Sequence, residues 1–323
     1  MNAFDVICLG DATIDVFLPL NKADQNYRIN DREISFELGD KFLVDGYKLF
    51  LGGIASNVAV SLSRLGKKVA LVTEVGEDEL SETILKRLKA EGVITDLIVK
   101  GKNTQTTLSV IISSQKNHIL FVAHNPKDHR FDFKDSITSW IYLTGLGNNW
   151  EHAYENAVAF AKEKNVKIAF APGISQIQGG KEKIMNVLGN SEIIFLNKNE
   201  AQMISGENQD VKSLLSSLRK YGSKVIVVTD GLNGSYVLDE NLNFFHLGIR
   251  EVDVVETTGA GDAYAGAFFA AFIDQRPIEE CMKWGTLNSS SAVEKVGAQQ
   301  GLLSIEEMQE RIEKTTDLNV ERI

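Results

Sequence analysis

The chain has only two cysteines, Cys8 and Cys281, among its 323 residues. Both lie within apolar segments and not in a paired loop framework, so nothing indicates disulfide bonds or an oxidising compartment. Basic charge is also scarce, since 34 Lys and Arg stand against 44 Asp and Glu, for a net charge of −10. A protein that neutralises phosphates normally shows a basic surface, and this balance argues against nucleic acid as a partner.

Long hydrophobic runs are missing as well. The longest strongly apolar helix candidate, Ala263 to Ile273, covers eleven residues, whereas a bilayer span needs roughly 20. The amino-terminal segment has no basic stretch, and its apolar run stops at Asp11, so no targeting signal is recognisable. We therefore expect no membrane partner and a cytoplasmic location.

Four prolines leave little room for a Pro-rich linker, while 43% hydrophobic residues suffice for a substantial core. Short apolar, β-branched segments alternate with amphipathic segments of helical length along almost the whole chain. This alternation predicts one α/β domain over residues 1–323, with a mostly parallel sheet flanked by helices on both faces. Strands are predicted at Phe4 to Leu9, Val69 to Val75, Trp140 to Leu143, Lys167 to Ala171, Ile193 to Leu196 and Lys224 to Thr229, and helices at Ala55 to Leu65, Glu79 to Glu91, Glu151 to Lys164 and Val211 to Lys220.

Two regions interrupt this alternation. Residues 15–50 are polar and irregular, and residues 104–125 contain a predicted hairpin, Thr106 to Ser113 and Asn117 to Ala123, across the turn Ser114-Gln115-Lys116. We expect the two regions to form a small sheet apart from the main one. Long insertions in compact domains often cover a site, so this sheet is predicted to be a β lid. Surface excursions without a function are the alternative.

The segment Glu256 to Asp262 carries the most specific chemical signal. Gly259, Ala260 and Gly261 lead into a helix that is apolar on nearly every side. Backbone N–H groups at such a helix start lack intrahelical partners and can bind a phosphate without any basic side chain. Asp262 lies in the first turn, where a capping role is the simpler alternative. A carboxylate beside a bound phosphate costs electrostatic energy, and this favours a catalytic role.

Two further segments indicate a binding site for a hydroxylated ligand. Gly52 and Gly53 precede a helix that carries Asn57 in its first turns, and paired glycines let backbone approach a ligand closely. In an extended backbone, Asp11, Thr13 and Asp15 lie on one face, beyond the end of the first strand. Ligands of open α/β sheets gather at this edge, and two carboxylates with a hydroxyl suit a polyol better than a phosphate.

Polar residues also follow two later strands. Asn197 and Glu200 come after the strand Ile193 to Leu196 and are spaced to bind a hydrated magnesium ion, with a helix capping box as the equally simple alternative. Thr229, Gly231 and Gly234 follow the next strand. That segment favours a hairpin turn first and a nucleotide contact second.

The order of these signals resembles the PfkB family of carbohydrate kinases, whose best-known branch is ribokinase, from Val6 to Leu303. Gly52-Gly53 with Asn57 and Ala59 matches the family's first signature. Glu256 to Asp262 with Gly266 matches the second, D-T-T-G-A-G-D, which is highly specific. The other matches are Asn197 to Glu200, with the family's N-x-x-E element, and Thr229, Gly231 and Gly234, with its T-x-G-x-x-G turn.

This resemblance implies a ribokinase-like fold and an ATP-dependent, magnesium-requiring kinase acting on a hydroxyl group of a small sugar or polyol. Asp262 would be the general base, and the N–H groups of Gly259, Ala260 and Gly261 would form an anion hole for the transferred phosphoryl group. Substrate hydroxyls would be held by Asp11, Thr13, Asp15, Gly52, Gly53 and Asn57. The nucleotide and Mg²⁺ would be held by Asn197, Glu200 (Mg²⁺ through water), Thr229, Gly231, Gly234 and Asn288.

The chain departs from the family pattern at two positions. The leading Asp of the second signature, which in many relatives helps to bind an activating monovalent cation, is Glu256 here. The extra methylene moves the charge, so the sequence leaves undecided whether Glu256 and Thr258 form a K⁺ site. Thr13 stands where ribokinase has a sugar-binding Asn, which weakens ribose as the substrate. The remaining alternatives are a nucleoside kinase and a non-catalytic sugar-binding relative, and pairing of two chains through the lid is also expected from the resemblance.

Overall fold

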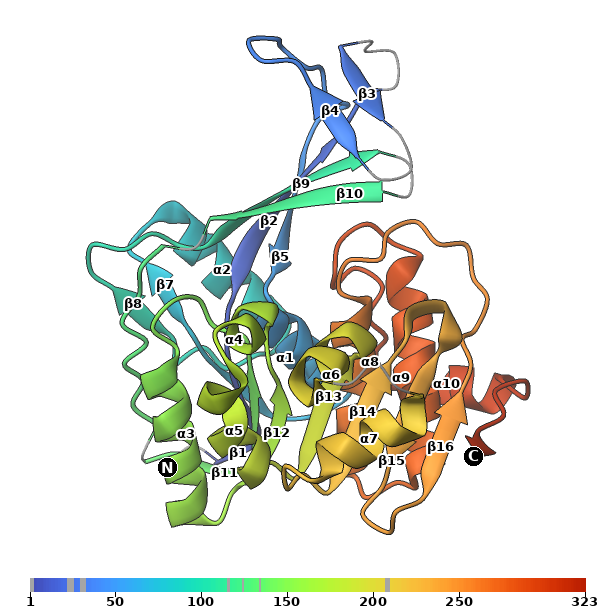
Figure 1. Ribbon diagram of the computed structural model, residues 1–323. Helices are drawn as coiled ribbons and strands as arrows, with labels where there is room; N and C mark the ends of the chain where they lie inside the picture. Colours follow the sequence, from blue (N-terminus) through green and yellow to red (C-terminus); the bar gives the residue numbers. More distant parts are fainter. Residues whose placement is uncertain are drawn as a thin grey trace.

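The computed structural model describes residues 3–21, 26–29, 33–114, 117–123, 125–133, 135–206 and 210–323. Its centre is a nine-stranded sheet in the order β17-β16-β15-β14-β13-β12-β11-β1-β6 (Figure 1). The six strands from β14 to β6 in this order are parallel, and β15, β16 and β17 at the other end pair antiparallel. The parallel strands are β1 (Ala3–Leu9), β6 (Val69–Val72), β11 (Ile137–Thr144), β12 (Lys167–Ala171), β13 (Ile193–Asn197) and β14 (Val225–Thr229), and the antiparallel ones are β15 (Ser235–Leu238), β16 (Phe244–Leu247) and β17 (Glu321–Arg322).

Helices pack on both faces of this sheet and create two separate hydrophobic cores. In β1, Val6 and Cys8 point into one core, while Ile7 and Leu9 point into the other, as the two-residue period of a strand requires. The first core is covered by α1 (Ile54–Arg64), α2 (Glu79–Ala90), α8 (Ala260–Ile273), α9 (Ile278–Val293) and α10 (Ile305–Lys314), and the second by α3 (Glu151–Lys164), α4 (Ile174–Gln178), α5 (Lys181–Asn190), α6 (Lys198–Ser205) and α7 (Val211–Arg219).

A smaller, four-stranded sheet stands apart from the main one, at the top of Figure 1. It has the order β10-β9-β2-β5 and combines strands from both regions that interrupt the α/β alternation. Its strands are β2 (Thr13–Pro19), β5 (Lys48–Gly52), β9 (Leu108–Ser114) and β10 (Asn117–Ala123). Two further sheets have two strands each: β3 (Tyr27–Ile29) with β4 (Ile34–Phe36), and β7 (Glu74–Gly76) with β8 (Val99–Gly101).

The predicted hairpin is confirmed, because β9 and β10 pair antiparallel. Two residues of its turn, 115 and 116, lie outside the described residues, as do 22–25, 30–32 and 124 of the predicted lid. The predicted strand Val69 to Val75 is wrong in its second half, because the chain leaves β6 after Val72 and enters β7 in another sheet. Among the described residues, no helix has the length and apolar character to cross a membrane.

The chain passes from the main sheet to the small one between Gly10 and Ala12. A side chain at Gly10 would lie 2.6 Å from the methyl group of Thr144, so glycine permits the tight passage of the chain at this point. The prediction of one extended backbone from Asp11 to Asp15 is therefore correct only from Thr13 onward. This passage places Asp11 at the carboxyl edge of the main sheet and Asp15 in the small sheet.

Candidate active site

The start of α8 has the geometry of an anion site. Gly259 is the N-cap residue, in a left-handed conformation with φ of 81°, and no side chain caps the helix. The first turn of a helix leaves its N–H groups without intrahelical acceptors, and those of Gly261 and Asp262 belong to this turn. The N–H of Ala260 instead donates to the carbonyl of Thr257 at 3.2 Å. Of the predicted anion-hole donors, Ala260 therefore already has an acceptor in its own loop. The N–H groups of Gly261 and Asp262 remain as candidates.

Gly259 and Gly261 are glycines for different reasons. A Cβ on Gly259 would lie 2.4 Å from the Cβ of Ala298, so the turn after α9 packs directly against the start of α8. A Cβ on Gly261 would meet no atom within 4 Å, and this residue is exposed. The open space beside Gly261 is available to a ligand.

Asp262 lies in the first turn of α8 and is partly exposed. Its Oδ2 accepts a hydrogen bond from Nδ2 of Asn57, in α1, at 2.8 Å. Burial raises the pKa of its carboxyl group from 3.8 to about 7, the Asn57 hydrogen bond lowers it, and the carboxylates of Glu200 and Asp15 raise it. Such a pKa suits a group that exchanges a proton near neutral pH.

Two adjoining cavities meet at this turn. The smaller one, of about 140 Å³, is lined by Asp262, Glu200 and Asn197. The larger one, of about 610 Å³, is lined by Gly231, Gly234 and a mainly apolar group that includes Ile249, Val252 and Val293. Both cavities are bordered by Thr229, Gly261 and Tyr264.

Asn197 and Glu200 form a helix capping box at the start of α6. Oδ1 of Asn197 accepts the N–H of Glu200 at 2.9 Å, and Oε2 of Glu200 accepts the N–H of Asn197 at 2.8 Å. The capping alternative from the sequence is thereby confirmed, and it also fixes the Glu200 carboxylate on the wall of the smaller cavity. Burial raises the pKa of Glu200.

The hydroxyl-binding candidates gather where the small sheet meets α1. Thr13 donates its hydroxyl to Oδ1 of Asp15 at 2.9 Å, and burial raises the pKa of Asp15. A Cβ on Gly52 would lie 2.1 Å from Oδ2 of Asp15, which explains glycine at that position. Gly53 has φ of 91°, and a Cβ there would lie 2.5 Å from the carbonyl oxygen of Asp11. Both glycines thus let these two acidic residues approach the start of α1.

Asn288 occupies a different place from the one predicted. Its side chain is fully buried and donates to the carbonyl of Ala263 at 2.8 Å and to Ser61 at 3.1 Å, and it accepts the N–H of Leu303 at 2.9 Å. It therefore joins α1, α8 and the chain after α9, and it does not line the larger cavity. The residues of α9 that do so are Thr286, Ser289, Ser290 and Val293.

Glu256 turns back onto its own loop. Its Oε1 accepts the N–H of Thr257 at 2.8 Å, the N–H of Thr258 at 3.0 Å and the hydroxyl of Thr258 at 2.9 Å. These bonds hold the loop that leads into the start of α8.

Two buried polar residues beside the site carry no recognisable sequence signal. Gln299 hydrogen-bonds Asn57, and Lys127 is a buried cation close to Asp11, Glu74 and Asp78. Lys127 stands in a loop with no capping pattern, and Gln299 stands between Gly297 and Gly301 but outside every motif that the sequence analysis recognises. Only the fold brings them to the site.

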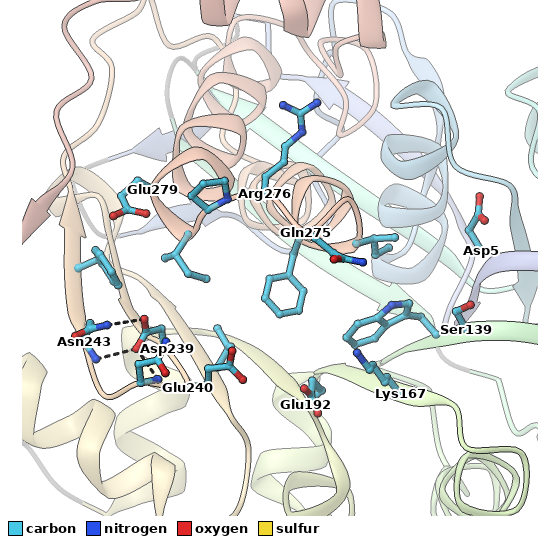
Figure 2. A pocket seen from close by; sticks show the side chains of 18 of the residues that line it. Asp5, Ser139, Lys167, Glu192, Asp239, Glu240, Asn243, Gln275, Arg276 and Glu279 are labelled. Atoms are coloured by element: carbon cyan, nitrogen blue, oxygen red, sulfur yellow. Dashed lines mark hydrogen bonds between the residues drawn. The ribbon is translucent and has the colours of Figure 1, made fainter.

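A further cavity, of about 1000 Å³, lies at the opposite end of the sheet (Figure 2). It is bordered by Asp5, Lys167 and Glu192, near the amino ends of the parallel strands, by Gln275 in the turn after α8, and by Glu279 in the first turn of α9. None of the predicted site residues lines it. The predicted site residues that line a cavity all do so at the carboxyl edge, where ligands of parallel sheets bind.

The carboxyl-edge site joins a helix start without a side-chain cap, a carboxylate with a raised pKa and a cavity of about 610 Å³, an arrangement that suits phosphoryl transfer. The family model of the pfkB carbohydrate kinases matches residues 5–305. The chain belongs to this family, whose members are phosphotransferases with an alcohol group as acceptor.

Individual relatives are distant in sequence. The 5-dehydro-2-deoxygluconokinase of Lacticaseibacillus casei is 22% identical, with 96% of each chain covered. The nucleoside kinase of Methanocaldococcus jannaschii superimposes with a TM-score of 0.78 at 22% identity, over 98% of this chain and 99% of that one. A ribokinase II candidate from E. coli, solved with ATP and Mg²⁺, superimposes with a TM-score of 0.80 at 18% identity, over 97% and 100%. These similarities establish the ribokinase-like fold.

Proposed function

We propose that this chain transfers the γ-phosphoryl group of ATP to a hydroxyl group of a small sugar or polyol, with Asp262 as the general base. The observation that carries this proposal is the position of Asp262. Its carboxylate touches Asn57 among the hydroxyl-binding candidates and lines the cavity that adjoins the larger, nucleotide-sized one. Asp262 thus lies between the hydroxyl-binding candidates and the cavity proposed for the phosphate.

The larger cavity is the proposed nucleotide site. Its volume of about 610 Å³ falls in the range of small-molecule sites, about 300–1,000 Å³. The apolar wall of Ile249, Val252 and Val293 suits a base, while Gly231, Gly234 and Gly261 permit close approach to the ribose and phosphates. A relative of the same fold that was solved with ATP and Mg²⁺ supports the choice of donor.

The residues of the smaller cavity fit a magnesium-bound phosphate. Glu200 offers a carboxylate and Asn197 an amide oxygen beside the N-terminus of α8, the hard oxygen ligands that Mg²⁺ prefers, directly or through water. Bound Mg²⁺ neutralises charge on the phosphates. The outer N–H groups of the α8 start donate to the transferred group.

Asp262 performs the proton transfer. It accepts the proton of the acceptor hydroxyl as that oxygen bonds to the γ-phosphorus, while the bond from phosphorus to the bridging oxygen breaks and ADP leaves. Asp15, Thr13 and the backbone at Gly52 and Gly53 orient the acceptor. The small sheet is proposed to be the lid whose closure excludes water and suppresses ATP hydrolysis.

An ADP-release assay over a panel of sugars, polyols and nucleosides tests this proposal. We expect turnover with at least one sugar or polyol, dependent on Mg²⁺ and lost in Asp262→Asn. Turnover with nucleosides alone would support the second candidate, a nucleoside kinase, which the likeness to the M. jannaschii enzyme favours. No turnover with any compound that stabilises the protein in a thermal-shift panel would instead indicate a binding protein.

Two accessory predictions belong to the same proposal. Exposed apolar side chains on the small sheet, Leu49, Leu120, Phe121 and Val122, support pairing of two chains through the lid, which sedimentation measurements test. A monovalent cation near Glu256 and Thr258 stays a prediction. Activity compared in K⁺ and in tetramethylammonium buffers tests it.

A further inference from the structure

A buried amide reaches Asp262 through one intermediate residue. Gln299 lies in the turn after α9 and is 4% exposed. Its Nε2 donates to Oδ1 of Asn57 at 2.9 Å, and Nδ2 of Asn57 donates to Oδ2 of Asp262 at 2.8 Å. Two hydrogen bonds therefore connect a loop that lines neither cavity to the proposed base.

We propose that Gln299 is a positioning residue that fixes the orientation of the Asn57 amide, so that its N–H group and not its oxygen faces Asp262. This inference rests on the proposed role of Asp262 as the general base. Asn57 would hold one oxygen of that carboxylate and leave the other for the proton of the acceptor hydroxyl.

The direction of this hydrogen-bond chain is set by backbone carbonyls. The hydroxyl of Ser56 lies against the carbonyl oxygens of Gly52 and Gly53, which only accept, so its proton points to them. The Ser56 oxygen is then an acceptor for Nε2 of Gln299, at 3.4 Å. Both contacts of Gln299 require its NH₂ group on the side of Asn57, and this group meets the amide oxygen of Asn57.

Reversal of the Asn57 amide would be unfavourable at both ends. Its oxygen would face the Asp262 carboxylate, and its NH₂ group would face the NH₂ group of Gln299. A buried polar contact that is lost in this way is unfavourable, because it leaves a donor or an acceptor without a partner. Without the Gln299 donor, only the Asp262 end would still favour the observed orientation.

The turn that carries Gln299 is held by contacts of its own. Nη1 of Arg64 donates to the carbonyl oxygens of Gln299 and Leu302, both at 2.9 Å. The same guanidinium group pairs with Glu91 through Nε at 2.8 Å and Nη2 at 2.7 Å. The bidentate geometry favours a single orientation of Arg64. The backbone of Gln299 is thus fixed by α1 and α2, independently of any ligand.

The proton affinity of Asp262 should respond to this chain. The titratable groups that face it are Glu200 from α6, Asp15 from β2 and Tyr142 from β11, and the Asn57 donor opposes the effect of the two carboxylates. When Asn57 no longer donates, the ionised form of Asp262 loses stabilisation, and its pKa rises.

The substitution Gln299→Met tests the proposal, because it keeps the length of the side chain and removes both donors. We expect the acid limb of the kcat/KM profile to move up by about half a pH unit or more, with kcat about three- to tenfold lower at pH 6.5 and within about twofold of the original at pH 9. KM for ATP should not change. Gln300→Met, at the exposed neighbouring residue, is the matched control and should leave the whole profile unchanged.

Ser56→Ala is a second variant, and its folding does not depend on the change at Gln299. It should move the acid limb of the profile in the same direction, but by less. A folded Gln299→Met protein whose acid limb coincides with that of the original would overturn the inference, as would a loss of activity that is equal at all pH values. If the original protein shows no turnover, or if Asp262→Asn is fully active, the proposed function fails first. The two failures are therefore distinguishable.

Discussion

At position 262, the free protein keeps a partly buried carboxylate near two others, Glu200 and Asp15. Such an arrangement disfavours ionisation, because burial removes water from the charge and the neighbours repel it. The same arrangement gives the carboxylate a proton affinity suited to accepting a proton from an alcohol. Stability and activity therefore have opposite requirements at this residue.

The stability cost of Asp262 is measurable. Its pKa is about 7 in the folded protein against an ordinary value of 3.8, so the contribution of this group to stability is complete below about pH 4 and is lost as the pH rises to about 7. We expect Asp262→Asn to be more stable than the original by about 1–3 kcal/mol at pH 8 and nearly equal to it at pH 4. Thermal unfolding at both pH values measures this difference. An equal shift at both pH values would contradict the explanation.

Lys127 is a second residue whose charge is set by its surroundings. It is 4% exposed, donates from Nζ to Oγ1 of Thr107 at 2.8 Å, and has a pKa lowered by burial and raised by Asp11, Glu74 and Asp78. We expect Lys127→Met to destabilise the protein by about 2–4 kcal/mol, because it leaves those carboxylates without the buried cation. Denaturant unfolding at pH 7 checks this, with the exposed Lys102 changed to Met as control. Equal stability of the two variants would refute a charge-balancing role.

At the scale of elements, the start of α8 contains two glycines with different roles: Gly259 packs against Ala298, and Gly261 has open space beside it for the proposed phosphate. Gly259→Ala places a Cβ 2.4 Å from Ala298 at a positive φ and should destabilise the protein by about 2–4 kcal/mol. Gly261→Ala meets no atom within 4 Å, so we expect an unchanged or slightly higher Tm and a loss of ATP turnover. Tm and ADP release of both variants check this. Normal turnover of Gly261→Ala would show that no phosphate lies beside that residue.

The elements that the sequence predicts well are those with one strong periodic signal. α3 has the predicted bounds, Glu151–Lys164, and the parallel strands are mainly apolar because helices cover both faces. Only the beginning of β2 is predicted as extended, and its limits are missed because they depend on a change of sheet at Gly10 to Ala12 that no local pattern signals. β17 has two exposed residues, Glu321 and Arg322, and it pairs only because β16 offers an edge.

The same distinction holds within the site. The glycines and Asp262 belong to contiguous motifs, so the sequence reveals them together. Asn288 is also recognisable as a helical polar residue, but its direction into the core depends on how α9 packs against α1 and α8. Gln299 acts through Asn57, which lies 242 positions away in the chain. Contacts of that kind arise only when the fold is complete.

At the scale of the whole molecule, the two ends of the sheet have different roles in this account. The proposed chemistry is confined to the carboxyl edge, under the small sheet, and the cavity of about 1000 Å³ at the amino ends takes no part (Figures 1 and 2). Lys167 and Glu279 border that cavity. We expect Lys167→Ala and Glu279→Ala to leave kcat and both KM values within about twofold of the original. A tenfold loss in kcat for either would mean that the amino-edge cavity acts on the reaction.

In the proposed mechanism, Asp262 accepts the proton of the acceptor hydroxyl beside a phosphate held by the start of α8. The most direct test is the rate of ADP release by Asp262→Asn and by the original protein, each at saturating ATP, Mg²⁺ and the acceptor found in the panel, together with the affinity for ATP. We expect kcat to fall by about 10²-fold or more, with nearly unchanged ATP affinity. A fully active Asn variant would contradict it and would leave Asp262 as only a residue of the first helical turn.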